Sequence, residues 1–524
     1  MASSPRTSST PEAPSPVVDE ESPLLGRPES PLHEVATRSK LLIYATFLGV
    51  FVASADESLV ISTYGTIASQ FQQLARGSWL LVSYNFGFCV SLPVYGTLSD
   101  SFGRKNVLLA SYAAFMTGCL FCGASTSITQ LAISRAISGI GGGGMMTVVS
   151  IIITGRSIGA PIGGILADTI GWKLSFFGQV PFVVLSALIV IIWLPASTER
   201  TRETVEIDQT TGGSSRRARL SDIDYAGIVL LSSTVLLLLF LLQVIGSREP
   251  HPSTVVYLSA AFLLSGVLLV LFETYGTIKP LIPMALLKQA LGAHCLVQVV
   301  LNAGRFALVS NIMPYFIRVD NASSFEASLA YLPMAIGTSI GGIVSGLVIK
   351  RTGRTKPMIL ISLLVTLAGL TALLLAWRSS SSPWKRVYLI PLGAAPGLIF
   401  PCLFASMTSL CPEDALSICI GIFYLSQQLG FIVGPAAGTA LVQGFFSKSL
   451  WRELGDVAHK KLIIQRVLND ISFAATLPPS LQTVVKSCYL RSFQSAPIFA
   501  IVMTALTLPI LLLMRDNGLK FAPK

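Results

Sequence analysis

A short basic stretch that separates two apolar runs occurs twice in this chain, once in each half. The copies read GTLSDSFGRK at 96–105 and GLVIKRTGRTK at 346–356, and they begin 250 residues apart (346 − 96). Each copy keeps a glycine, a second glycine seven residues later and an arginine directly after it. A basic, glycine-containing hairpin between membrane helices, repeated once per half, predicts a transporter built from two copies of one helical bundle.

Long apolar runs dominate the sequence, which is 52% apolar and only 12% charged. This composition excludes an ordinary soluble protein, because runs of about 20 apolar residues are long enough to cross a bilayer as helices. The net charge is +11, but the basic residues lie mostly between the runs, so we attribute it to membrane topology and not to nucleic-acid binding. The eight cysteines are dispersed, mostly within apolar runs, and are interpreted as small apolar side chains. The predicted helices lie near 41–62, 79–98, 107–124, 129–152, 174–194, 226–246, 254–273, 291–316, 328–349, 357–376, 387–409, 415–441 and 491–514.

The polar segments divide the chain into parts. Residues 1–38 are rich in serine and proline, and we expect a disordered cytosolic tail there. Within the tail, Glu20, Leu24 and Leu25 resemble an acidic dileucine sorting signal that an adaptor protein would bind, a pattern short enough to arise by chance as well. The other parts are an N-terminal helical bundle at 39–195 that is shortened at 150–171, a cytosolic linker at 196–225, two additional membrane helices at 226–275, and a C-terminal helical bundle at 290–515 with a long lumenal loop at 443–488.

The first half is shorter than the second between two matching landmarks. GAPIGG at 159–164 has a counterpart in GPAAG at 434–438, and the distance from the hairpin is 63 residues in the first half (159 − 96) but 88 in the second (434 − 346). Both hairpins should face the cytosol, which requires an even number of crossings between them and therefore a separate short crossing at 153–171. We expect a deletion of about one loop and half a helix around 150–171. Helices 4 and 5 would then be fused or joined by a very short break. Unequal evolution of the two halves is the alternative.

The hairpin and several longer stretches resemble a known family. The pattern Gly-x-Leu-x-Asp-x-x-Gly-Arg-Lys at 96–105 resembles the helix 2–3 loop of the major facilitator superfamily, and the fourteen expected segments resemble its fourteen-helix drug:proton antiporter subfamily. The stretches at 49–71, 79–100 and 139–152 look most like fungal vacuolar basic amino acid transporters. The resemblance implies an all-α integral membrane protein with the major facilitator fold. That fold has two six-helix bundles plus two extra helices, here with the helix 4/5 region truncated.

Asp56, Glu57 and Arg135 are charged residues that lie inside predicted membrane helices. A carboxylate in a membrane costs several kcal/mol unless it is paired or protonated, so Asp56 and Glu57 are expected to be functional. Adjacent residues point about 100° apart on a helix, so at most one of them faces a central cavity squarely. Arg135 needs a carboxylate or carbonyl partner, and Asp56 is a candidate. The resemblance implies proton coupling or cation recognition for Asp56 and proton transfer for Arg135. The alternatives are a packing hydrogen bond for Asp56 and an arginine that extends to the membrane surface.

The other candidate residues are polar groups on helices and two glycine-containing motifs. Asn85, Arg305 and Gln427 are expected on cavity-lining or packing helices. The glycine run at 139–144 lacks a following Lys-Ser/Thr pair, which favours close helix packing over phosphate binding. The resemblance implies a gating role for the first hairpin, although positive-inside topology suffices for its lysine, and an antiporter-type helix bend for the Gly-Pro motif. These residues are Gly96, Asp100, Gly103, Arg104 and Lys105 in the hairpin, and Gly159, Pro161, Gly163 and Gly164 in the motif.

The sequence contains no nucleophile motif, metal cluster or cofactor motif, so we expect a protein that is not an enzyme and uses no cofactor. The leading hypothesis is a proton-coupled secondary active transporter of the vacuolar membrane that moves basic amino acids into the vacuole by alternating access. Its expected partners are a small cationic substrate, protons and the lipid bilayer, and no nucleic acid. The alternatives are a multidrug or toxin:proton antiporter of the plasma membrane, a nutrient receptor that does not transport, and a non-functional variant, which the gap suggests.

Overall fold

The computed structural model describes residues 31–102, 104–149, 172–193, 224–245, 251–276, 284–288, 290–378, 383–411, 416–455, 459–471 and 473–514. Every regular element within these ranges is a helix. Nine helices in this part of the chain are long and apolar enough to cross a membrane, and two shorter apolar helices cover Ser78–Leu92 and Val180–Ile192. The all-helical membrane architecture expected from the sequence is confirmed.

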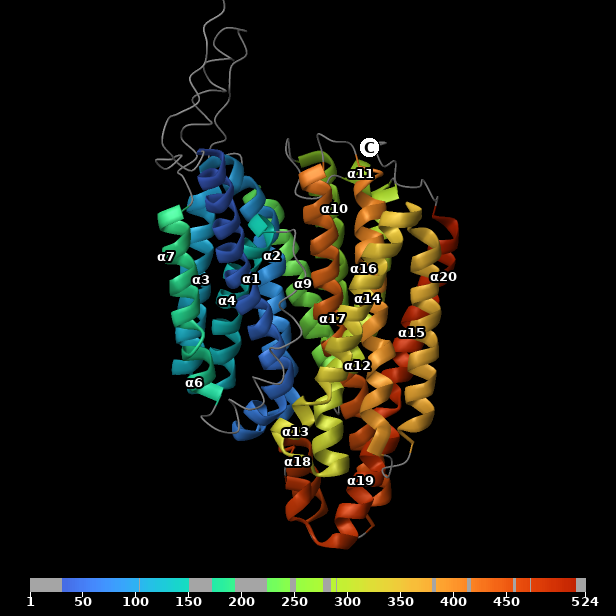
Figure 1. Ribbon diagram of the computed structural model, residues 1–524. Coiled ribbons are helices and arrows are strands. Elements are labelled where there is room, and N and C mark those ends of the chain that lie inside the picture. Colours follow the sequence, from blue (N-terminus) through green and yellow to red (C-terminus); the bar gives the residue numbers. More distant parts are fainter. Residues whose placement is uncertain are drawn as a thin grey trace, which may run out of the picture.

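The first half forms one group of helices (Figure 1). It contains α1 (Pro31–Gln70), the short η1 (Leu74–Arg76), α2 (Ser78–Phe102), α3 (Arg104–Ala124), α4 (Ile128–Val149), α6 (Trp172–Phe177) and α7 (Val180–Trp193). Buried aliphatic and aromatic side chains from α1, α2, α3, α4 and α7 make up a shared core. Because these helices pack on one another, polar side chains on α1, α2 and α4 lie inside the group.

Two further helices follow, and they separate the two halves in sequence. They are α9 (Tyr225–Ile245) and α10 (Pro252–Leu271), and a single π-helical turn at Phe272–Gly276 continues α10. α9 packs against both α2 and α17, whereas most of α10 is exposed. In Figure 1 the green α9 lies between the blue and the orange helices. α9 therefore touches both halves of the molecule.

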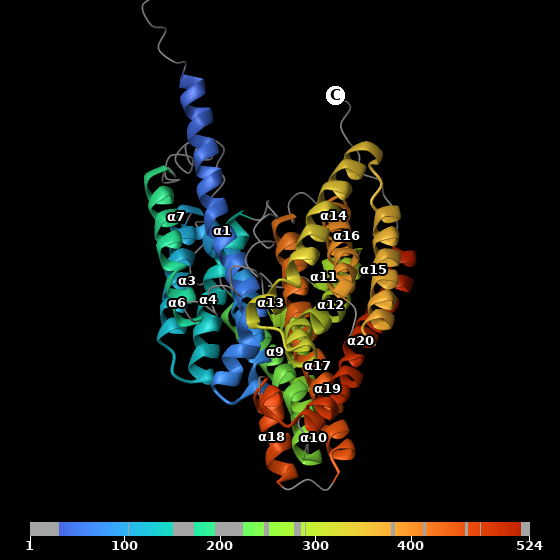
Figure 2. The ribbon, with the colours of Figure 1, turned by 60° about the horizontal axis from the view of Figure 1, so that its bottom comes forward.

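The second half forms another group of helices and carries an additional helical cap. Its helices are α11 (Met284–Leu287), α12 (Ala290–Asp320), α13 (Ser324–Ser328), α14 (Tyr331–Thr352), α15 (Lys356–Ala376), η5 (Pro383–Tyr388), α16 (Leu389–Thr408), α17 (Leu416–Glu453) and α20 (Ser495–Leu513). The cap consists of α18 (Lys460–Asn469), η7 (Phe473–Thr476) and α19 (Pro479–Phe493). We call the end of the molecule that carries these elements the cap end, and the end with the α2–α3 and α14–α15 connections the hairpin end; the two are opposite (Figures 1 and 2).

Glycine allows several of these helices to approach backbone to backbone. A Cβ atom on Gly139 would collide with the carbonyl oxygen of Tyr84 on α2, and one on Gly141 would collide with the backbone nitrogen of Phe115 on α3. Gly430 and Gly434 on α17 face the backbone of α12 in the same way. The expectation that the run at 139–144 serves helix packing is thus confirmed.

The thirteen expected helical runs all fall on helices, although the run at 174–194 is divided between α6 and α7 and two boundaries differ from the expectation. α1 begins at Pro31, so the expected tail boundary at residue 38 lies inside a helix, and proline suits a first helical turn. α17 continues to Glu453, so the segment 443–488, expected as a loop, contains the rest of α17 and most of the cap, which ends at Phe493. The expected deletion at 150–171 and its consequences for helices 4 and 5 lie outside the described residues, as does the linker up to residue 223.

Candidate functional site

The site is built around an ion pair between α1 and α4. Asp56 and Arg135 are each 1% exposed, and Arg135 Nη1 donates a hydrogen bond to Asp56 Oδ2. The expected pairing is present, and it argues against an Arg135 that extends to the membrane surface. A buried guanidinium that faces a buried carboxylate avoids the cost of an isolated charge in the membrane.

Gln179 completes the environment of the carboxylate. Its Nε2 donates to Asp56 Oδ1 at 2.9 Å, so both carboxylate oxygens are bound, one by a charged donor and one by a neutral donor. Gln179 lies at the break between α6 and α7, where the run expected as one helix at 174–194 is interrupted. Gln179 is not among the residues expected from the sequence. The dipeptide Gly178-Gln179 two residues before Pro181 is a signal for the break, but it does not indicate which side chain turns inward.

Two aromatic side chains lie next to the arginine. The guanidinium carbon of Arg135 lies 4.4 Å from the centroid of the Tyr84 ring and 5.8 Å from that of Phe176. Rings at this distance attract a cation through their quadrupole and exclude water. The Nε of Arg135 also points to the carbonyl of Leu80, at the long distance of 3.5 Å. Arg135 is therefore held by one carboxylate, one carbonyl and two rings.

Glu57 and Asn85 are the sequence neighbours of Asp56 and Tyr84. Glu57 is buried at 9% exposed, and the helix turn of about 100° sends its side chain away from the direction of Asp56. Asn85 is 3% exposed and donates from Nδ2 to the carbonyl of Leu81 at 3.0 Å, while its Oδ1 has no hydrogen-bond partner among the residues described. Asn85 thus retains a free acceptor inside the bundle.

Arg305 and Gln427, two other candidates, belong to the second half. Arg305 on α12 is partly buried, and its guanidinium carbon lies 5.4 Å from the centroid of the Phe306 ring. Gln427 on α17 is buried at 8% exposed. Neither is among the groups that hold Asp56. The structure therefore groups Asp56 with Arg135 and Gln179, whereas Arg305 and Gln427 belong to helices of the second half.

The hairpin lysines have matching contacts in the two halves. Lys105 Nζ donates to the carbonyl of Ile191 near the end of α7 at 2.9 Å. Lys356, which lies one residue further along the second hairpin, donates to the carbonyls of Leu512 at 3.0 Å and of Met514 at 2.6 Å, at the end of α20. A cation near the last carbonyls of a helix compensates both unpaired acceptors and the helix dipole. The expectation that topology alone accounts for Lys105 is therefore incomplete.

Other expected site residues lie outside the described part of the chain. These are Glu20, Leu24 and Leu25 in the tail, Gly103 in the hairpin, and Gly159, Pro161, Gly163 and Gly164 in the Gly-Pro motif, while Gly96, Asp100 and Arg104 are described as helix backbone without their side chains. The second hairpin shows what its glycine does: Gly353 ends α14 with φ of 63°, a conformation that side chains with a Cβ atom adopt rarely.

Hydrogen bonds across the two halves close the cap end. Ser69, at the end of α1, accepts from the backbone nitrogen of Ile471 at 2.8 Å, and Thr66 lies 2.8 Å from the hydroxyl of Ser324. Tyr64 donates to the carbonyl of Ser310 on α12. Arg318 of α12, 4% exposed, donates to the carbonyl of Val467 on α18 at 2.7 Å. The segment that follows α18 is thereby attached to α1 on one side, and α18 itself is attached to α12 on the other.

The described residues contain no group of three or more His, Cys, Asp or Glu side chains placed to hold a metal ion. What the arrangement around Asp56 offers is a carboxylate whose two oxygens are bound by groups from two other segments. Because these groups come from α4 and from the α6–α7 break, the charge of Asp56 attaches both segments to α1.

Comparisons with known proteins agree with the architecture. The profile of the Major Facilitator Superfamily matches residues 46–157 and 153–435. Three curated relatives cover most of the chain. Multidrug resistance protein fnx1 of Schizosaccharomyces pombe is 29% identical over 88% of this chain and 89% of its own length, and the vacuolar membrane amino acid uptake transporter fnx2 of the same yeast is 28% identical over 88% and 81%. Vacuolar basic amino acid transporter 2 of Saccharomyces cerevisiae is 25% identical over 85% and 98%.

Proposed function

Because the chain belongs to the Major Facilitator Superfamily, and is therefore a multi-pass membrane transporter and not an enzyme, we propose that it couples transport to protons through Asp56. The observation that carries the proposal is the bonding of Asp56. This buried carboxylate is held by Arg135 from α4 and by Gln179 from the α6–α7 break. A group that alternates between a charged, paired state and a neutral, protonated state changes the attraction between those segments.

We propose alternating access as the transport cycle, with the structure closed at the cap end. Support comes from the contacts of Ser69, Thr66 and Tyr64 with the second half, since these must break before that end can open. α1 carries both Asp56 and these three residues. A change in the bonding of Asp56 can therefore affect the contacts that close the cap end. Asp56 lies ten residues before Thr66, about 15 Å along the helix axis.

The substrate class that we propose is basic amino acids, moved into the vacuole. Two buried carboxylates in α1, Asp56 and Glu57, favour a cationic substrate. The relatives named as vacuolar amino acid transporters support the same class and membrane. The hairpin residues Lys350, Arg351, Arg354 and Lys356 favour a cytosolic position for the hairpin end, and the cap end would then be lumenal.

Uptake of labelled lysine, arginine and histidine into isolated vacuoles tests the proposal. Vacuoles that contain the protein should accumulate at least one of these amino acids when a proton gradient is present, and a protonophore should abolish the accumulation. The Asp56→Asn variant should reach the same membrane and show no gradient-dependent uptake. Gradient-dependent uptake that is equal in both proteins would overturn the assignment of Asp56.

A second candidate is export of cationic drugs, because a relative of similar identity is named a multidrug resistance protein. The same carboxylates would serve a cationic drug. Resistance of intact cells to a cationic dye, without any amino acid uptake into vacuoles, would favour this candidate over the first. In both cases the coupling residue is Asp56.

A further inference from the structure

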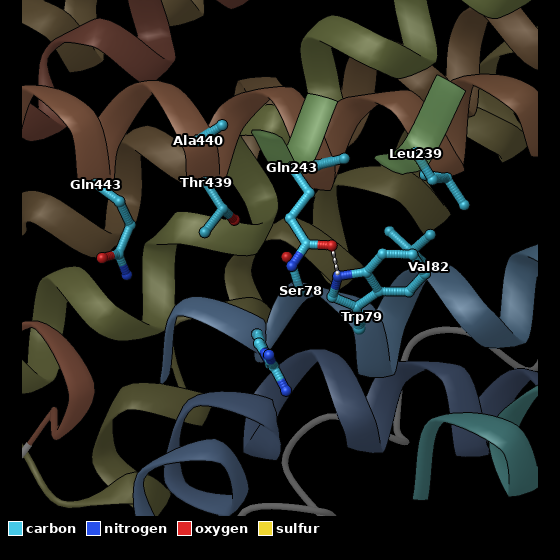
Figure 3. A pocket seen from close by; sticks show the side chains of 10 residues that line it. Ser78, Trp79, Val82, Leu239, Gln243, Thr439, Ala440 and Gln443 are labelled. Carbon is cyan, nitrogen blue, oxygen red and sulfur yellow. Dashed lines mark hydrogen bonds between the residues drawn. The ribbon is translucent and has the colours of Figure 1, made fainter. Parts of the chain in front are cut away.

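A cavity of about 190 Å³ lies at the cap end, on the seam between the two halves. Its walls come from the start of α2, the end of α9 and the middle of α17, and Figure 3 shows the side chains that line it. Trp79 Nε1 donates to Gln243 Oε1 at 3.0 Å and so joins α2 to α9 across one side. This cavity is distinct from the cluster around Asp56, since it shares no residue with that cluster.

The lining is polar toward the cap end and apolar toward the membrane interior, and each of the three helices shows this change. On α9, Leu239 lies one turn further from the cap end than Gln243. On α17, Ala436 lies two turns further from the cap end than Gln443. On α2, Val82 lies about 4.5 Å beyond Trp79. A cavity with polar groups at the membrane surface and an apolar floor fits a molecule with the same polarity. Tryptophan at its rim is typical of the bilayer interface.

Two groups in the lining are suited to bind the polar part of such a molecule. Thr439 is 6% exposed, yet its hydroxyl has no hydrogen-bond partner among the residues that the structure describes. A buried hydroxyl without a partner costs free energy, and a ligand that accepts from it would recover that cost. Arg76, at the end of η1, is exposed at the mouth of the cavity and supplies a positive charge.

We propose that this cavity binds one phospholipid from the leaflet at the cap end. Arg76 pairs with the phosphate, Thr439 donates to an ester carbonyl of the glycerol backbone, and an acyl chain follows Val82 and Leu239 toward the membrane interior. Such a lipid contacts α2 of the first half, α17 of the second half and α9. It therefore binds the conformation in which the cap end is closed.

Native mass spectrometry of the full-length protein with added phosphatidylglycerol tests the proposal, and diacylglycerol of the same chain length serves as the probe without phosphate. The wild type should bind phosphatidylglycerol more tightly than diacylglycerol. Arg76→Gln should reduce the affinity for phosphatidylglycerol about fivefold and leave that for diacylglycerol unchanged, since one arginine near a lipid surface contributes about 1 kcal/mol. Thr439→Val should weaken both lipids by roughly threefold, the effect of one hydrogen bond.

Arg452→Gln is the matched control, because Arg452 is another exposed arginine, located near the end of α17 and outside the cavity. It should leave both affinities unchanged. A larger side chain at Ala440, in Ala440→Phe, should exclude both lipids, and its elution as a single symmetrical peak would show that it is folded. Equal lipid affinities in the wild type, Arg76→Gln and Thr439→Val would overturn the proposal. So would competition by glycerol phosphate as strong as that by the intact lipid, which would show a site for soluble anions.

Discussion

Replacing Asp56 by asparagine removes one charge of a buried pair and leaves the other in place. Asparagine has nearly the same volume, and its oxygen can still accept a hydrogen bond, so packing changes little. Arg135, however, is 1% exposed and would lose its only ion-pair partner among the described residues. Two opposite charges about 3 Å apart attract each other by roughly 5–6 kcal/mol at an effective dielectric constant of about 20, a sum that the desolvation of both charges largely offsets.

The expected destabilisation follows from that balance. Removal of one partner from a buried pair costs about 3–5 kcal/mol, because the remaining charge stays buried without compensation. Since asparagine keeps an acceptor and Tyr84 still covers the guanidinium, we expect about 3 kcal/mol for Asp56→Asn. Arg135→Met removes the other charge and should cost a similar amount. In the double variant neither charge remains, and the cost should be well below the sum of the single costs.

Denaturant titration in mixed micelles, followed by tryptophan emission, measures these three free energies of unfolding. The difference between the double variant and the sum of the singles gives the coupling energy, for which we expect about 2–3 kcal/mol. The double variant also separates stability from function, because it should be folded and yet fail to couple uptake to protons. Additive effects of the two substitutions would refute the ion pair as an energetic unit.

Four further predictions concern the other contacts. Gln179→Leu should lower proton-driven uptake several-fold while leaving localisation unchanged, because Asp56 loses its second donor; normal uptake would show that Gln179 is dispensable. Lys356→Ala should lower the free energy of local opening in the last turn of α20 by about 0.5–1 kcal/mol, which amide hydrogen exchange measures. Lys350→Ala is the control. A disulfide between cysteines placed at Ser69 and Ile471 should stop uptake, and a reductant should restore it; uptake through the cross-linked protein would contradict closure at this end. Replacing Leu24 and Leu25 by alanine should move a tagged protein from the vacuole to the cell surface, and unchanged vacuolar fluorescence would show the pair to be incidental.

The membrane helices and the central ion pair could be predicted from the sequence for one reason. Apolar runs and buried charges have large free energies in a bilayer, so Asp56 and Arg135 stood out against their surroundings and each required a partner. The residues that bind them carry no such signal. Gln179 is a neutral side chain at a helix break, and only the packing of that break against α1 directs it toward Asp56.

Two other features were beyond the sequence for different reasons. Lys105 and Lys356 look like ordinary positive-inside residues, and their contact with the helix ends depends on how α7 and α20 pack. The cap has the mixed polarity of a surface loop, and its role depends on single hydrogen bonds such as that between Ile471 and Ser69. The shortened region at 150–171 remains a prediction, supported by the fact that the two matched stretches of the family profile meet at 153–157. Restoring about one loop and half a helix there should raise the folded yield.

Proton movement driven by substrate tests the central claim most directly. Liposomes that contain the purified protein and a trapped pH-sensitive dye should report a change in internal pH when lysine or arginine is added outside, with no change for a neutral amino acid. The Asp56→Asn protein should show no substrate-driven pH change at the same protein density. A pH change of the same size in the wild type and in Asp56→Asn would contradict the role of Asp56 as the coupling group.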